Sequence, residues 1–190
     1  SDLISFVKKR TEILIDSYNK SFFKDSNINV ATARAGNVIG GGDWSENRLI
    51  PDMIRAKIAN EPLIIRSPKA IRPWQHVLEP LFGYLKLAMG LYDNPELNIG
   101  PWNFGPEIKD VKTVEDIIHI GKKLEIVGEV VLETPNLVEA QCLMLNISKA
   151  KQKLKFKPLW NSEKAIEKTF NWYLNYNNES SNTNKLIESD

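Results

Sequence analysis

Helical and extended patterns of apolar residues alternate along this chain, and the alternation restricts the fold more than any other feature of the sequence. Apolar residues recur at helical spacing over about residues 2–23, and a β-prone run, INVATAR, follows at residues 28–34. The same change of period recurs until about residue 176. Such alternation is typical of proteins in which helices pack on a mainly parallel sheet. The sequence therefore predicts the α/β class.

The later elements are marked by end residues as well as by periodicity. Pro51 suits the first turn of a helix, and the serine and threonine side chains near other apolar repeats can cap helix N-termini. We predict helices that begin near Pro51, after Thr113, at Ser148 and at Ser162, and one more over residues 81–91. Predicted strands lie at residues 63–65, 102–104, 127–132 and 143–147.

The composition excludes several classes of protein. A hydrophobic share of 42% and a charged share of 26% are those of an ordinary globular protein, and the net charge of +1 gives no sign of nucleic acid or an anionic membrane as a partner. No apolar run approaches the roughly 18–20 residues of a membrane span, and the first residues lack the pattern of a secretory signal. The single cysteine, Cys142, can form no internal disulfide, so the reducing cytoplasm is the expected location.

The chain lacks the glycine-rich turn of a dinucleotide-binding unit. Such a unit begins with a strand, a turn of the type G-x-G-x-x-G and a helix whose N-terminus receives the pyrophosphate. Here the glycines at positions 36, 40, 41 and 42 predict a loop, but their spacing is wrong for this motif and they lead into Asp43-Trp44. We therefore expect no NAD binding by this chain alone. His76 and His119 lie far apart, and no cluster of side chains predicts a metal site.

The segment ARAGNVIGGGDW, residues 33–44, carries the most specific pattern. It resembles the R-x-x-N-V-x-G element of extended short-chain dehydrogenases/reductases, the NAD-dependent epimerase/dehydratase family, and its GGGDW continuation is similar to the CDP-glucose 4,6-dehydratase branch. In that family the element lines the sugar-nucleotide site. Asn37 offers amide donors and an acceptor at a strand end, where ligands bind in open α/β sheets. The alternative is that Asn37 and the glycines simply form a turn.

A second segment, RSPKAIRPWQHVLEP at residues 66–80, resembles the family's R-x-W-x-x-V-x-(D/E) element, whose arginine contacts the nucleotide diphosphate. The resemblance assigns that contact to Arg72. Arg66 is a second candidate, although its match to the motif is looser. In both cases a guanidinium can bind phosphate through two parallel hydrogen bonds. An extended or hairpin geometry would place both arginines on one side. The alternative for the arginines is that they are solvated charges. Trp74 is expected to serve in packing, with a stacking surface for the ligand as the other reading.

Arg48 precedes a predicted helix in a stretch that resembles the family's nucleotide-binding entry to a helix. Free N–H groups at a helix start and the arginine charge both favour an anion, although Arg48 could equally be an exposed loop charge. Later runs, WNFGP at residues 102–106 and EAQCLMLNISKAK at residues 139–151, also resemble the family, so the resemblance extends from about Thr11 to Tyr176. Val138, where the family has His, and Cys142, where an aromatic residue is frequent, depart from its pattern.

The first predicted helix resembles the helix that carries the family's Y-x-x-x-K pair, in which a lysine lowers the pKa of a catalytic tyrosine. Alignment places Lys8 at the lysine and Ile4 at the tyrosine. Isoleucine has no proton to transfer, so Lys8 could be an ordinary surface lysine. The resemblance thus supplies a candidate catalytic residue, Lys8, without its partner.

The resemblance implies the C-terminal part of a Rossmann-like enzyme with a small sugar-nucleotide-binding domain and without the N-terminal dinucleotide-binding unit. We expect residues 1–43 to be a remnant of the Rossmann-like domain, 44–176 to bind the sugar nucleotide and 177–190, rich in Ser and Asn, to form a flexible polar tail. The family is a lyase that converts CDP-glucose to CDP-4-keto-6-deoxyglucose and water with bound NAD. Expected partners are a CDP-sugar and a separate N-terminal chain or a homo-oligomer. Alternatives are a non-catalytic sugar-nucleotide-binding or interaction module, or a remnant of a related epimerase.

Overall fold

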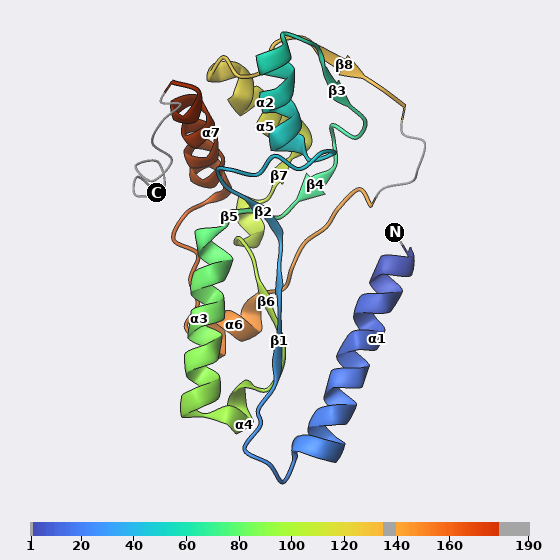
Figure 1. Ribbon diagram of the computed structural model, residues 1–190, viewed down its shortest axis with the longest axis vertical. Helices are drawn as coiled ribbons and strands as arrows, with labels where there is room; N and C mark the ends of the chain where they lie inside the picture. Colours follow the sequence, from blue (N-terminus) through green and yellow to red (C-terminus); the bar gives the residue numbers. More distant parts are fainter. Residues whose placement is uncertain (1, 135–139, 179–190) are drawn as a thin grey trace.

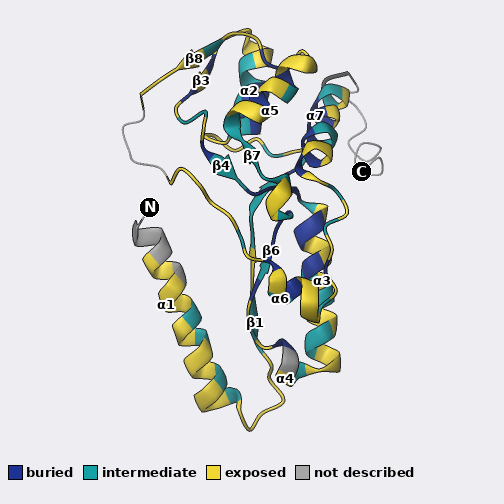
Figure 2. Ribbon diagram, turned by 180° about the vertical axis from the view of Figure 1, so that it is seen from behind, coloured by how far each residue is buried: buried dark blue, intermediate teal, exposed yellow. Residues whose placement is uncertain are grey.

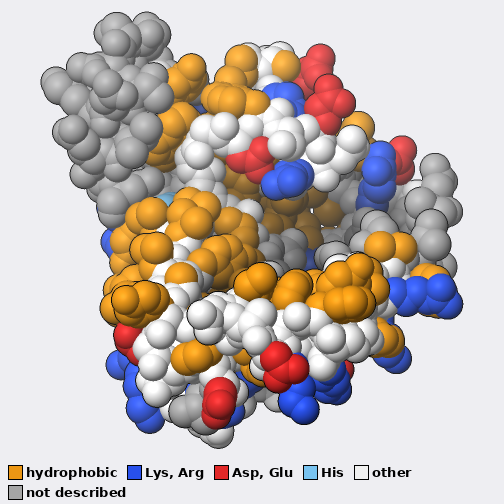
Figure 3. Space-filling view, turned by 60° about the horizontal axis from the view of Figure 1, so that its bottom comes forward, with side chains coloured by type: hydrophobic (Ala, Val, Ile, Leu, Met, Phe, Trp, Pro, Cys, Tyr) orange, Lys and Arg blue, Asp and Glu red, His pale blue; other side chains and the backbone are white. Residues whose placement is uncertain are grey.

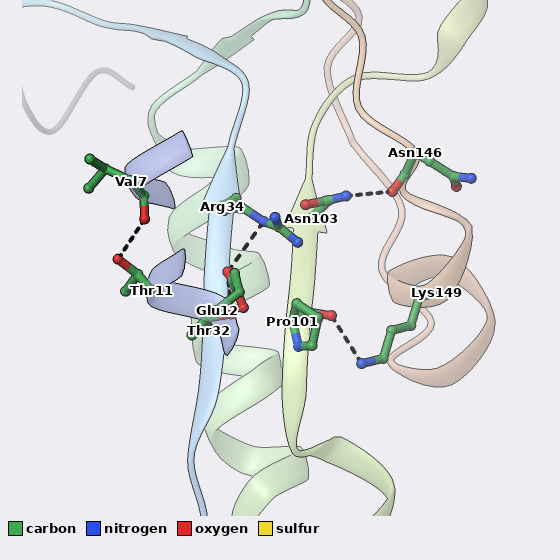
Figure 4. A network of polar contacts seen from close by, with 9 residues as sticks. All are labelled: Val7, Thr11, Glu12, Thr32, Arg34, Pro101, Asn103, Asn146 and Lys149. Atoms are coloured by element: carbon green, nitrogen blue, oxygen red, sulfur yellow. Dashed lines mark hydrogen bonds and ion pairs between the residues drawn. The ribbon is translucent and has the colours of Figure 1, made fainter. Parts of the chain in front are cut away.

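The first helix and first strand of the chain form an antiparallel arm held by a polar contact. The computed structural model describes residues 2–134 and 140–178. Helix α1 (Asp2–Tyr18) continues into a π-helical turn, η1 (Asn19–Phe23), and the chain returns along strand β1 (Ala31–Ala35) (Figure 1). The Thr32 hydroxyl donates to the Glu12 carboxylate at 2.7 and 2.9 Å, and Arg34 Nε lies 3.8 Å from Glu12 Oε1 (Figure 4). These contacts fasten α1 to β1.

Strand β1 pairs in parallel with β6 (Gly100–Phe104), and α1 and α3 (Leu78–Asp93) flank this pair on opposite sides (Figure 1). The short helix α4 (Pro95–Asn98) links α3 to β6, and α6 (Ser148–Lys153) packs on β6. Lys149 of α6 donates to the Pro101 carbonyl at 3.0 Å (Figure 4). Its Nζ also lies 4.0 Å from the centre of the Trp102 ring. The smaller hydrophobic cluster lies between these elements and consists of Leu87, Trp102, Phe104, Ala150 and Phe156.

The remaining elements form the upper part of the molecule in Figure 1 around a larger hydrophobic cluster. Three strand pairs occur there: β2 (Asn37–Ile39) parallel to β5 (Trp74–His76), β3 (Leu63–Ile65) parallel to β8 (Val130–Leu132), and β4 (Ile71–Arg72) antiparallel to β7 (Lys112–Thr113). The helical segments there are α2 (Leu49–Ala59), η2 (Ile108–Asp110), α5 (Val114–Lys123) and α7 (Ser162–Asn178). Burial of Ile117, Phe170 and Tyr173 at 1% exposure or less places the core between α5 and α7.

Most predicted elements are confirmed, and the α/β class is confirmed. The strand at residues 63–65 has the predicted bounds, and Thr113 caps α5 through a reciprocal pair of contacts with Asp116. The strand predicted over 143–147 is wrong. Among the described residues of this region, a bridge to Ile71 forms only at Cys142, just before the predicted strand, and β4 is two residues long and offers few backbone groups for pairing. The predicted tail began too early, since α7 runs through Asn178, and residues 179–190 lie outside the described part.

Two helices leave large apolar side chains exposed. Most of α1 is exposed, whereas α3 is buried on one side and exposed on the other (Figure 2). Hydrophobic side chains gather over α3 on one face of the molecule (Figure 3), where the exposed residues are Leu78, Leu81, Phe82, Leu85, Met89 and Tyr92. Among the described residues, no helix combines the length and the apolar character needed to cross a membrane.

Candidate functional site

A cleft of about 540 Å³ collects candidate residues from three separate segments. It lies where the chain leaves β1, where β4 leads into β5, and where α2 begins. The polar and aromatic side chains that line it belong to Asn37, Asp43, Asn47, Arg48, Arg72 and Trp74. Ligands of α/β proteins bind beyond the carboxyl ends of parallel strands, and Asn37 stands at such an end.

Gly36 explains why the chain turns at this point. The Gly36 amide donates to the Phe104 carbonyl at 3.2 Å, whereas the next amide, that of Asn37, donates to the Pro73 carbonyl at 2.9 Å. The chain therefore changes pairing partner from β6 to β5 at one residue. A Cβ atom at position 36 would lie 2.5 Å from the Pro73 carbonyl oxygen, so a side chain would push the strands apart. This close approach places Asn37 opposite Trp74.

Arg48 stands at the N-cap of α2 in an extended conformation, with φ −119° and ψ 135°. Its Nη1 donates to Asp43 Oδ2 at 3.1 Å, and the Ser45 amide donates to Asp43 Oδ1 at 3.0 Å. Burial acts to raise the pKa of Asp43, but the Ser45 hydrogen bonds and the Arg48 charge outweigh it and hold that pKa below its ordinary value. A carboxylate and a guanidinium thus stand together at a helix N-terminus, a place that favours anions.

Arg72 lines the same cleft, and Arg66 does not. Arg72 Nη1 donates to the carbonyls of Ile71 and Ala140, at 2.9 and 2.8 Å. Arg66 lines a neighbouring cleft of about 740 Å³, and its Nε donates to Glu133 Oε2 at 2.8 Å. The structure therefore brings together Asn37, Arg48 and Arg72, and the expected shared side for the two arginines of the second motif is not observed.

Lys8 and Ile4 lie one turn apart on the backbone of α1, and both side chains lie outside the described part of the structure. Val138 also lies outside it. Arg34, which opens the first motif, lies near Glu12 of α1 (Figure 4). This contact joins α1 to β1, so Arg34 has a structural role that the motif did not predict.

Asp43 and Asn47 are cleft residues that sequence reasoning left without a binding role, and Trp74, expected as packing or as a stacking surface, lines the cleft with them. One signal for Asp43 was its place directly after three glycines in the most specific motif of the sequence. Asn47 has φ 60°, a left-handed conformation that Asn tolerates better than most residues. Among the described residues, no group of His, Cys, Asp and Glu is arranged to hold a metal ion.

Comparison by sequence relates the chain to a sugar-nucleotide dehydratase. It is 40% identical over 181 residues to CDP-glucose 4,6-dehydratase of Salmonella typhimurium, a match that covers 90% of this chain and 50% of that protein. It is 26% identical over 171 residues to UDP-glucose 4-epimerase of Mycoplasma genitalium, covering 82% of this chain and 50% of that protein. The chain thus spans about half the length of the curated relatives it matches, and no family model matches it.

Comparison by structure gives the same fold. UDP-glucose 4-epimerase of Thermotoga maritima, solved with UDP-glucose, matches with a TM-score of 0.74 at 21% identity over 92% of this chain and 53% of that one. dTDP-glucose 4,6-dehydratase of Bacillus anthracis, solved with NAD, matches with a TM-score of 0.68 at 18% identity over 89% of this chain and 50% of that one. By its sequence similarity to half of a CDP-glucose 4,6-dehydratase and by its fold, the chain belongs to the NAD-dependent epimerase/dehydratase family.

Proposed function

We propose that this chain is the C-terminal, sugar-nucleotide-binding part of a CDP-glucose 4,6-dehydratase-like enzyme and that it has no activity alone. The reaction of the whole enzyme is the conversion of CDP-glucose to CDP-4-keto-6-deoxyglucose and water. In this proposal residues 44–176 form the sugar-nucleotide-binding region, and residues 1–43 are a remnant of the Rossmann-like domain that contributes Asn37 to the same cleft. The observation that carries the proposal is the cleft in which Asn37, Arg48 and Arg72 meet. The identity of 40% to the Salmonella typhimurium dehydratase supports the choice of substrate.

The cleft has the chemistry that a nucleoside diphosphate requires. Two guanidinium groups and the N-terminal amides of α2 attract the diphosphate, and charge-assisted hydrogen bonds make that contact strong. Asn37 can donate to and accept from sugar or nucleoside hydroxyls. Asn47 and Leu49 line both this cleft and the neighbouring one, so the two hollows adjoin and offer room for a base as well as a sugar.

The described residues do not fit NAD. The glycine run after β2 leads into an irregular turn and not into a helix, and a Cβ atom at Gly41 would lie 2.0 Å from the Trp172 ring. An aromatic side chain therefore packs directly against this loop and leaves no room for a pyrophosphate on that side. Lys8 has isoleucine, not tyrosine, one turn before it. The half of the relatives that this chain does not span would have to supply the cofactor site and the acid/base tyrosine.

Calorimetric titration with CDP at low salt tests the binding half of the proposal. We expect saturable binding, with CDP-glucose bound at least as tightly and UDP more weakly. Absence of heat at millimolar CDP would contradict the proposal. Tighter binding of UDP would favour the epimerase alternative, which the 26% identity to UDP-glucose 4-epimerase supports more weakly.

Incubation with CDP-glucose and NAD tests the second half. We expect no 4-keto product from this chain, whereas the complete Salmonella typhimurium dehydratase, run in parallel, forms it. Product above background from this chain alone would show that the missing functions lie within it. A non-catalytic sugar-nucleotide-binding module would give the same negative result.

A further inference from the structure

Aromatic residues of the C-terminal helix enclose the loop beside the cleft. The Trp44 ring lies edge-on to Tyr173 at 5.2 Å and 5.9 Å from Tyr176, measured between ring centres. The Trp172 and Tyr176 rings stack at 5.1 Å with an interplanar angle of 12°. Loop 40–44 is thus packed against one face of α7, although the two segments lie far apart in the sequence.

The glycines of this loop allow its backbone to pack closely on that face of α7. The backbone at Gly41 approaches Trp172 so closely that a Cβ atom would lie 2.0 Å from the ring, and Gly42 has φ +78°. Glycine allows both the contact and the left-handed conformation. The glycines of the GGGDW segment are therefore required for close packing on the aromatic side chains of α7 as well as for the turn.

A chain of polar contacts leads from α7 through this loop to the cleft. The Tyr173 hydroxyl donates to the Asp43 carbonyl oxygen, and Asp43 Oδ2 accepts from Arg48 Nη1 at 3.1 Å. Tyr173 is 1% exposed, whereas the Arg48 side chain is 62% exposed and lines the cleft. The series begins in the core and ends at a cation that a ligand can reach.

A second anchor holds the other side of the loop. Arg55 of α2 donates to the carbonyls of Trp44 and Ser45, at 2.9 and 3.0 Å. The loop backbone is thereby held from α2 and from α7, with Asp43 between the two anchors. The direction of the Asp43 carboxylate then depends on both helices.

We propose that Tyr173 is a positioning residue for nucleotide binding: its hydroxyl fixes the backbone of Asp43, and Asp43 in turn directs Arg48 into the cleft. This inference rests on the proposed function. An arginine held in its binding conformation loses less conformational entropy when an anion binds, so affinity depends on groups that never touch the ligand. Trp172 and Tyr176 contribute by shaping the surface against which the loop packs.

Tyr173→Phe tests the proposal because it removes the hydroxyl and keeps the ring. Affinity for CDP should fall about threefold to tenfold, the loss expected from one hydrogen bond. Tyr84→Phe is the matched control, since the Tyr84 ring packs on Phe104 in the smaller cluster, and it should leave affinity unchanged. Equal affinity for Tyr173→Phe and the original chain would overturn the proposal.

Double variants separate positioning from general loosening. In an Arg48→Ala background, Tyr173→Phe should cause no further loss of affinity, because the group that it directs is gone. Asp43→Asn keeps the backbone contact but weakens the pair with Arg48, so it should reproduce the loss and should not add to that of Tyr173→Phe. Additive losses in these combinations would mean that Tyr173 acts only through stability, and the proposal would fail.

Hydrogen exchange gives a readout that needs no ligand. Tyr173→Phe should speed amide exchange in residues 43–48 and leave exchange in α3 unchanged. The control Tyr84→Phe should change exchange in neither region. Unchanged exchange in residues 43–48 overturns the positioning role whether or not CDP binds. If the original chain does not bind CDP, the proposed function fails, and the exchange result alone decides whether Tyr173 fixes the loop.

Discussion

At the scale of single residues, Arg72 combines charge with a fixed position. Carbonyls of Ile71 and Ala140 hold its Nη1, and the side chain lines the cleft. A guanidinium that is already oriented loses little freedom when it binds phosphate. This arrangement agrees with the role that the second motif predicts for it as the main diphosphate contact.

Arg72→Ala should therefore weaken CDP binding at least about tenfold, equivalent to roughly 1.4 kcal/mol. Titration at fixed low salt measures this effect. Arg66→Ala is the matched arginine control and should cost less, since Arg66 pairs with Glu133 and lines the neighbouring cleft. Lys8→Ala should leave CDP affinity unchanged. Loss of affinity for Lys8→Ala greater than for Arg72→Ala would show that the assignment of residues to the site is wrong.

Tyr173 should titrate far above an ordinary tyrosine. Burial, followed by the charge of Asp43, raises its pKa to about 12. The neutral phenol is therefore favoured in the folded state, and its contribution to stability is complete below the unfolded pKa of about 10 and is lost as pH rises toward 12. Tyrosinate absorbance should show a component near pH 12 that Tyr173→Phe removes and Tyr92→Phe, a change at an exposed ring, retains. A curve unaltered by Tyr173→Phe would contradict this assignment.

Motifs predicted the residues of the cleft better than the contacts that organise them. Asn37, Arg48 and Arg72 could be found because each lies in a short segment whose pattern is local. The Tyr173–Asp43 contact joins residues 130 positions apart, so no local pattern contains it. Arg66 was placed with Arg72 from spacing alone, and the turn between β3 and β4 separates their clefts.

At the scale of elements, the contact between the glycine loop and α7 leaves no space for a side chain at Gly41. The Trp172 ring that faces Gly41 is 7% exposed and stacks on Tyr176, so it cannot move aside easily. Any side chain at Gly41 must displace the loop or the helix. Crowding of this kind in a packed region destabilises a protein.

Gly41→Ala should lower the free energy of unfolding by about 1–3 kcal/mol. Denaturant unfolding monitored by circular dichroism measures the change. Gly128→Ala is the control, because a Cβ atom there meets nothing within 4 Å, and stability should stay the same or rise slightly. Equal stability of the two variants would mean that α7 shifts to accommodate the added methyl group, and it would contradict this prediction.

Elements were predicted where a side-chain pattern decides the structure. The strand at 63–65 and the capped helix α5 were found because buried positions and a Thr113 cap mark them. The false strand at 143–147 has a suitable apolar pattern but lacks a partner of sufficient length. Pairing is a property of two segments, and the sequence of one does not reveal the length of the other.

At the scale of the whole molecule, the exposed apolar side chains of α1 and α3 stand out. Leu85 is 65% exposed and Met89 64% exposed, and they lie in line on α3. Clustered exposed apolar side chains favour association in water. The predicted α/β class and family were confirmed at this scale, because the alternation of elements and the motifs extend over most of the chain.

The chain should therefore self-associate as its concentration rises. Sedimentation velocity over a range of concentrations should show growing assemblies, and the double substitution Leu85→Lys with Met89→Lys should reduce them without lowering CDP affinity. Ile108→Lys, on η2 at a residue that is also 64% exposed, serves as the control and should leave the association unchanged. A monomer at all concentrations would contradict this expectation.

The exchange of pairing partners at Gly36 has a consequence for the order in which the molecule folds. Residues 31–35 pair with 100–104, and residues 37–39 pair with 74–76, so both pairings close long stretches of chain. Closing long loops costs entropy that is recovered only after the contacts form, which slows folding. The cleft at Asn37 needs both pairings, so it forms late, and the appearance of nucleotide binding during refolding should lag behind the formation of helices.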